Sequence, residues 1–250
     1  MKFQSKRYYP VEQYQYPSVT TIIKDVKGDG YGLVLWKMKN TGRAVIEEIR
    51  KMATDNEESL ISRLELDGTL DDEILKQAMK APDKESGKAK KIGTLTHEYI
   101  EQHMKGERPT ITPEIEKPVQ AFIQWYEEWK VFPLFVEHKI VSNKYGYAGR
   151  TDFIAEMKAP TWRRRRVLIG DFKTSALIYE DMRWQLGAYY KAFHEEKLCK
   201  LQGGIIVRLD KETGHPHRKV YSTKDLNKEF KVFKAMVDIF YLTNSWEGKK

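Results

Sequence analysis

The feature that most constrains the fold is a change in hydrophobic periodicity at Phe132. Before it, apolar residues recur at helical spacing; after it come three segments rich in β-branched and aromatic residues. We predict strands over Leu134–Val141, Tyr147–Met157 and Val167–Phe172, because turn residues separate them. Three such segments in succession favour a meander, so a sheet must follow a helical region.

The rest of the chain predicts an α/β fold: a mixed central β-sheet flanked by helices, with a helical N-terminal region. We expect one domain over residues 1–250, divided into a mainly helical region (1–130), a sheet core (131–222) and a C-terminal helix (223–250). Further strands are expected at Gly203–Leu209 and Lys219–Tyr221. One helix is expected to begin at Ser18 and another at Pro113. Further helices are expected over Leu33–Met52, with a possible break at Gly42, and over Leu60–Leu64, Asp71–Met79, Ile92–Met104 and Glu180–Lys197. The segment Ala81–Gly87 is expected to be a linker.

Charge and cysteine content narrow the function classes. The net charge is +8, from 44 basic and 36 acidic residues, which suits a polyanionic partner such as DNA. A single cysteine, Cys199, excludes an internal disulfide and a four-cysteine metal site within the chain. No secretory h-region and no apolar run of about 20 residues is present, so we expect a cytoplasmic protein without a membrane partner.

The strand ending at Gly170 leads into Asp171-Phe172-Lys173. Alternation along a strand puts Asp171 and Lys173 on one face and Phe172 on the other. A carboxylate that holds a hard cation, beside an ammonium that offsets negative charge, suits metal-assisted phosphodiester hydrolysis. Acid-x-Lys triplets are common, and Glu156-Met157-Lys158 is one that we interpret as a solvated pair. The apolar run before Asp171 and the polar Thr174-Ser175 after Lys173 distinguish this triplet.

A second carboxylate, Asp152, interrupts the apolar segment that begins at Gly149. If this strand pairs with the Asp171 strand, the two acids can converge on one ion. The alternative is an acid on a solvated face, paired with Arg150. Gly149 itself would allow another group to approach the backbone closely.

These residues resemble a known family. Gly149-x-x-Asp152, then Asp171-x-Lys173-Thr174, then Gln185 and Tyr189 are similar to the motifs of the PD-(D/E)XK nuclease superfamily. Gly93-x-x-x-His97 resembles an element of its RecB-like exonuclease branch, and the segment from Pro17 to Ile22 resembles the opening of small viral and mitochondrial-type members. The matching elements span roughly residues 17–190.

The resemblance implies a restriction-endonuclease-like core and a site. His97, Asp152, Asp171 and the Phe172 carbonyl would bind one or two Mg²⁺ or Mn²⁺ ions, and Lys173 would be the catalytic lysine. Gln185 would steady the site or contact DNA, and Tyr189, on the same helix face, would contact DNA. Glu137 matches an acidic position that many relatives have before the Gly-x-x-Asp strand, and it is a possible further metal ligand. An iron–sulfur cluster is not expected, because its cysteines are missing.

Other residues are candidates for holding DNA. Arg163, Arg164, Arg165 and Arg166 lie in the turn between the two catalytic strands, where the alternative is a solvated hairpin tip. Ser18 and Thr20 could donate to a phosphate at a helix N-terminus, as the resemblance suggests, or simply cap the helix. Tyrosines from Tyr8 to Tyr16 flank Arg7 and could stack on bases or pack within the protein.

Together these features predict a metal-dependent DNA exonuclease acting in replication, repair or recombination, with recombination or replication proteins as further partners. A structure-selective endonuclease would use the same centre. A DNA-binding or recombination-partner protein with a retired nuclease centre is the alternative from another class.

Overall fold

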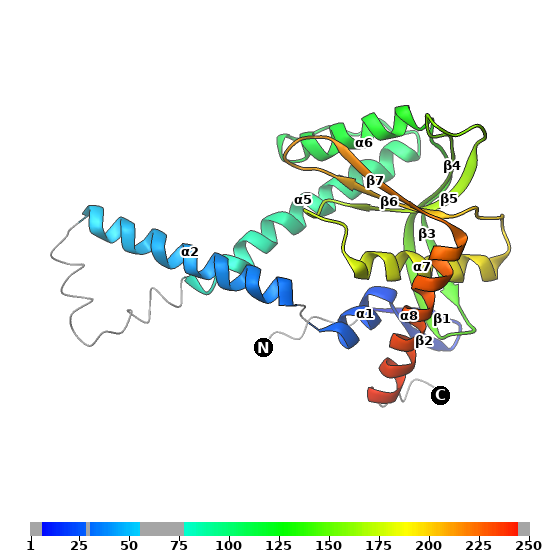
Figure 1. Cartoon of the computed structure of the whole chain (residues 1–250), viewed down its shortest axis with the longest axis horizontal. Coiled ribbons are helices and arrows are strands. Elements are labelled where there is room, and N and C mark those ends of the chain that lie inside the picture. Colours follow the sequence, from blue (N-terminus) through cyan, green and yellow to red (C-terminus); the bar gives the residue numbers. More distant parts are fainter. Residues whose placement is uncertain (1–6, 29–30, 56–77, 245–250) are drawn as a thin grey trace. The chain divides into compact units, whose positions relative to one another are not determined.

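The computed structural model describes residues 7–28, 31–55 and 78–244 (Figure 1). In chain order, the elements are β1 (Tyr8–Val11), β2 (Tyr14–Pro17), α1 (Val19–Lys27), α2 (Tyr31–Asp55), α5 (Ala81–Met104), the 3₁₀ turn η1 (Pro113–Ile115), α6 (Glu116–Glu128), β3 (Phe132–Ser142), β4 (Tyr147–Met157), β5 (Arg166–Lys173), α7 (Glu180–Glu196), β6 (Gly204–Leu209), β7 (Pro216–Tyr221) and α8 (Thr223–Thr243). The expected α/β class is confirmed.

Within the described residues, the central sheet has five strands in the order β3-β4-β5-β6-β7. The β3-β4-β5 meander is antiparallel, as expected, and β6 then pairs with β5 in parallel, because α7 carries the chain back across the sheet. β7 completes the sheet antiparallel to β6. The sheet is therefore mixed, as predicted.

Helices cover both faces of this sheet (Figure 1). One face carries α7 with α1 and α8, and its core contains Ile22, Ile154, Ile169, Leu186 and Phe233. The other face carries α6 and the C-terminal part of α5, and its core contains Tyr99, Phe122, Trp125, Phe153 and Phe172. Both faces of the central strands are thus buried, which explains their nearly continuous apolar sequences.

The N-terminal region differs from the helical prediction in three places. Tyr8–Val11 and Tyr14–Pro17 form an antiparallel hairpin, in which Tyr14 and Tyr16 stack. α2 continues through Gly42, because one interior glycine costs only about 1 kcal/mol. The expected linker at Ala81–Gly87 is the first part of α5, since Pro82 lies in the first turn, where a missing N–H is tolerated. Ser18 caps α1 as predicted.

Close contacts divide the chain into two units, residues 1–28 with 92–250, and residues 29–91. The sheet and all the residues of the candidate site belong to the first. The second contains α2 and the beginning of α5. The short helices expected at Leu60–Leu64 and Asp71–Met79 lie outside the described residues, apart from the last two positions. Among the described helices, none combines the length and apolar character that a membrane crossing requires.

Candidate metal centre

The two central strands separate where the predicted acids lie. Backbone pairing of β4 with β5 extends from Met157 and Arg166 to Phe153 and Gly170, and stops there. Beyond this point side chains replace the ladder, since Thr151 Oγ1 donates to the Gly170 carbonyl (3.0 Å) and Asp152 Oδ2 accepts from the Phe172 N–H (2.6 Å). The two strands therefore stay connected through side chains beyond the end of the ladder, where the predicted acids lie.

The strand β3 is distorted at the same level. Glu137 has φ +52°, a left-handed conformation that a glutamate in a strand rarely adopts. Alternation is also interrupted in β4, because Tyr147 and Ile154 pack in the same core although their positions differ by an odd number, which puts two residues of a regular strand on opposite faces. Backbone distortion of this kind is concentrated at functional sites. Here it lies in adjacent strands, at Glu137 and between Tyr147 and Ile154.

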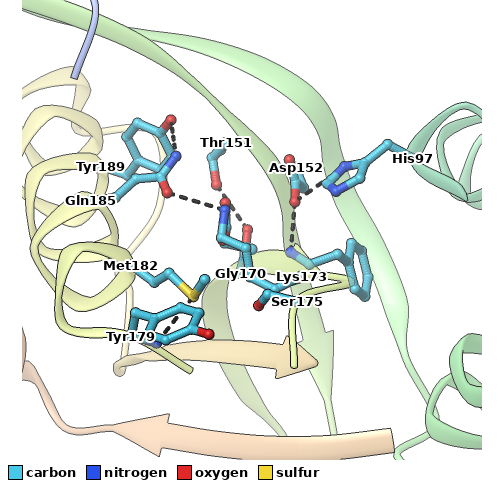
Figure 2. A network of polar contacts seen from close by, with 12 residues as sticks. His97, Thr151, Asp152, Gly170, Lys173, Ser175, Tyr179, Met182, Gln185 and Tyr189 are labelled. Atoms are coloured by element: carbon cyan, nitrogen blue, oxygen red, sulfur yellow. Dashed lines mark hydrogen bonds and ion pairs between the residues drawn. The ribbon is translucent and has the colours of Figure 1, made fainter. Parts of the chain in front are cut away.

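The distortion brings three potential metal ligands together. One ligand atom from each of His97, Glu137 and Asp152 lies within 4.8 Å of the others. His97 approaches from α5, with Nδ1 3.6 Å from Asp152 Oδ2, and Figure 2 shows the imidazole pointing at that carboxylate. Ligand bonds of about 2.0–2.6 Å to a shared divalent ion give ligand separations of this size.

The electrostatics of these groups also fit a cation. Burial, and then the charge of Asp171, raise the pKa of Asp152 from 3.8 to about 8. Burial, and then the charge of Asp152, raise the pKa of Glu137 to about 7, although Arg150 pairs with Glu137 at 2.6 Å. Burial lowers the pKa of His97, which favours the neutral imidazole that a metal requires. A divalent ion would relieve the repulsion between the carboxylates, so the donor set fits Mg²⁺ or Mn²⁺.

Asp171 and Lys173 form the second part of the site. Asp171 is 2% exposed, and its Oδ2, which has no well-aligned hydrogen bond among the described residues, lies 2.6 Å from Lys173 Nζ. Burial opposes the charge on Lys173, but Asp171 and Asp152 outweigh it and raise the pKa of Lys173 above its ordinary value. Lys173 is thus an ammonium ion in this arrangement. The expectation that Asp171 and Lys173 share a face agrees with this contact, and Phe172 packs in the opposite core.

A hydrogen-bonded chain from α7 positions the lysine (Figure 2). Lys173 Nζ donates to Gln185 Oε1 (3.1 Å), and Gln185 Nε2 donates to the Tyr189 hydroxyl (2.7 Å). Tyr189 is 4% exposed, and its ring lies where a side chain at Gly149 would be. As expected from the sequence, another group approaches the backbone closely at Gly149, and that group is the Tyr189 ring. Tyr189, predicted to contact DNA, is part of the protein interior.

The arginine-rich turn lies away from this cluster. The turn begins after Met157, the last residue of β4, which is five residues from Asp152, or roughly 17 Å at the usual rise of a strand. Arg165 pairs with Glu156 (2.6 Å) and donates to two carbonyls, and Arg166 lies over the Trp162 ring at 4.4 Å. Exposed Arg163 and Arg164 have no such contact described.

The other predicted DNA contacts lie at α1. Ser18 is buried, and its hydroxyl accepts from the Thr21 N–H (3.0 Å). This hydrogen bond is the one expected if Ser18 caps the helix. Thr20 is exposed. Ser18 also forms a bridge with Ala148, at the start of β4.

Sequence reasoning missed two features of the centre. Thr151, fully buried, closes the separated end of β4 through its bond to Gly170. Arg150 pairs with Glu137 at 2.6 Å, whereas we considered it as a partner of Asp152. A polar residue directly before Asp152 in an apolar strand was the available signal for Thr151. No sequence signal indicates the positive φ of Glu137.

Comparisons with known proteins leave the family open. No family model matches the sequence, and no curated protein matches it. Among solved structures, the chain is similar to one titled "Crystal structure of SSO0001", with 13% identity and a TM-score of 0.32, over 51% of this chain and 57% of that one. We base no argument about fold or function on a similarity at that level.

Proposed function

We propose that this protein is a divalent-metal-dependent DNA exonuclease of the PD-(D/E)XK superfamily, with a restriction-endonuclease-like core and closest to its RecB-like branch. The proposal rests on one observation above all. Acids from neighbouring strands meet at this point, since Asp152 Oδ2 accepts from the N–H of Phe172, the residue after Asp171 (2.6 Å), and Lys173 Nζ lies 2.6 Å from Asp171. The basic net charge of +8 supports a DNA substrate.

Each residue would have a distinct task. His97, Glu137 and Asp152 would hold the ion, and Asp171 would complete its coordination from the Lys173 side. A bound divalent ion supplies Lewis acidity and a more acidic water. Lys173, held by Gln185, carries a positive charge beside Asp171. It would stabilise the negative charge that develops on the phosphate oxygens.

End-labelled linear single strands, incubated with Mg²⁺ or Mn²⁺ and sampled over time, test the proposal. We expect wild-type protein to release nucleotides, and Lys173→Ala to be slower by about 100- to 1,000-fold, the usual cost of one such charge. The matched control is Lys158→Ala, which removes the lysine of the other acid-x-Lys triplet, Glu156-Met157-Lys158. It should degrade DNA at the wild-type rate.

Other substrates separate the rival functions. Covalently closed circular single strands should survive, because an exonuclease needs an end, and their cleavage would favour a structure-selective endonuclease. Equal DNA degradation by wild type and Lys173→Ala would refute the nuclease assignment. DNA binding without metal-dependent cleavage by either protein would favour the retired centre.

A further inference from the structure

A cavity lies at the ends of the parallel strands, directly after Lys173. β5 continues into Thr174 and Ser175, and β6 continues into Asp210 and Lys211, and these residues together with Arg208 line a cavity of about 130 Å³. This volume corresponds to roughly four water molecules, which suits a phosphate group and is too small for a nucleotide. Ligands of α/β sheets commonly bind outside the carboxyl ends of parallel strands.

Arg208 connects this cavity to the catalytic lysine. Lys173 and Arg208 are partners in the parallel register of β5 and β6. Partner side chains on adjacent strands lie on the same face of the sheet, about 4.8 Å apart along the hydrogen-bonding direction. Lys173 and Arg208 therefore lie next to each other on neighbouring strands, so a chain of phosphates crossing this edge would meet both.

One hydrogen bond orients the guanidinium of Arg208, and its other N–H groups have no hydrogen bond described. Its Nη1 donates to Asp210 Oδ2 at 3.1 Å, which is its one described hydrogen bond, and its side chain is 13% exposed. Arginine has five N–H donors in a fixed fork that fits phosphate oxygens. The remaining donors can therefore serve a ligand in the cavity that Arg208 lines.

Asp210 fixes the position of the Arg208 guanidinium. Its Oδ1 accepts from the backbone N–H groups of Glu212 and Thr213, both at 2.9 Å, and its Oδ2 faces Arg208. These bonds fix the turn after β6. Thr174 and Ser175 line the cavity from the end of β5, and Lys211 adds a second positive charge.

We propose that this cavity, with Arg208 as its principal donor, binds a backbone phosphodiester of the DNA strand next to the linkage that is cut. The inference rests on the proposed nuclease function, because it needs DNA at the neighbouring centre. It adds a site that fixes the register of the strand, so that the scissile phosphate meets the metal and Lys173. Arg208 is in this sense a substrate-binding residue rather than a participant in bond cleavage.

The first test is equilibrium binding of a fluorescent single-stranded oligonucleotide, measured by anisotropy in EDTA so that no cleavage occurs. Arg208→Gln should weaken binding about tenfold, as expected for the loss of one charge-assisted contact. The slope of log Kd against log salt concentration should fall by about 0.7, the value for one phosphate contact on a single strand. Lys211→Gln should act in the same direction, whereas Glu212→Gln, from the same rim, should strengthen binding.

The second test uses cleavage of the same oligonucleotide carrying one neutral methylphosphonate linkage. The linkage is moved along the strand one position at a time. At one position, beside the scissile phosphate, wild type should bind the substituted strand more weakly than the unsubstituted one, whereas Arg208→Gln should bind both equally. In steady-state kinetics Arg208→Gln should raise KM and leave kcat near the wild-type value. Lys231→Gln, on the exposed side of α8, is the matched charge control and should behave like wild type.

The possible failures are distinguishable. If wild type neither binds nor cleaves DNA, the proposed function fails and the phosphate site fails with it. If wild type cleaves DNA while Arg208→Gln, with an unchanged melting temperature, keeps its affinity, salt slope and methylphosphonate profile, the phosphate site alone is refuted. Thermal melting of each variant shows whether it is folded, and half-buried Lys211 provides a variant that leaves the Arg208–Asp210 pair intact.

Discussion

Replacing Gly149 with alanine should destabilise the protein through one contact. A Cβ at this position would lie 2.5 Å from Tyr189 Cε1 and 3.3 and 3.4 Å from two further ring atoms. The Tyr189 ring cannot simply turn into solvent, because it is 4% exposed and belongs to the core between the sheet and α7. The ring or the strand must shift.

Overpacking of this kind costs about 1–3 kcal/mol of unfolding free energy. For a chain of this size that corresponds to a melting temperature lower by roughly 2–12 °C. The shift should also disturb Gln185, which donates to the Tyr189 hydroxyl and accepts from Lys173. We therefore expect a fall in kcat beyond what the loss of folded protein explains.

Urea denaturation of a double-mutant cycle measures the contact directly. In a Tyr189→Leu background the aromatic ring is gone, so Gly149→Ala should cost little, which gives a coupling of about 1–3 kcal/mol. Gly87→Ala, at an exposed helical position with no atom near its Cβ, is the control and should cause no loss. The explanation is refuted if Gly149→Ala costs the same in both backgrounds, or costs nothing in wild type.

Three further predictions concern the centre, α1 and α8. The metal-free protein should lose stability as pH rises from about 4 to 8, because Asp152 and Glu137 ionise at lower pH in the unfolded chain than in the folded one. Mn²⁺ binds the ionised carboxylates, so it should raise the melting temperature more at pH 8 than at pH 6. An equal rise at both pH values would contradict the ligand assignment. Ser18→Ala should cost about 1 kcal/mol in urea denaturation and leave the DNA affinity unchanged, because Ser18 acts as a cap. The control is exposed Thr110→Ala, and weaker DNA binding by Ser18→Ala would instead support the phosphate contact. Phe233→Ala, in the core, should lower the free energy of unfolding in urea by about 3–5 kcal/mol. The adjacent, partly exposed Val232→Ala should lower it far less. Equal losses would mean that α8 does not pack on the sheet as described.

The sheet was the most predictable part of the molecule. Tyr147–Met157 matches β4 residue for residue, and Val167–Phe172 is one residue short of β5 at each end. These strands are buried on both faces, so nearly every position is apolar and the few polar residues are conspicuous. Asp152, Asp171 and Lys173 were identifiable for the same reason.

The rest could not be read from local pattern. The β1–β2 hairpin has strands of four residues, too short to show alternation, and its turn depends on Glu12 at φ +52°. Glu137 reaches the centre only because its backbone departs from strand geometry, and that departure depends on its neighbours in three dimensions. Arg208 looked like an ordinary strand residue until the parallel register placed it beside Lys173.

The most direct measurement is the anomalous scattering of manganese in crystals soaked in Mn²⁺. We predict a peak within coordination distance, about 2.0–2.6 Å, of His97, Glu137 and Asp152, on the side of Asp171 and absent from crystals of Asp152→Asn. A well-ordered wild-type crystal with no peak there, or with Mn²⁺ bound only elsewhere, would contradict the account.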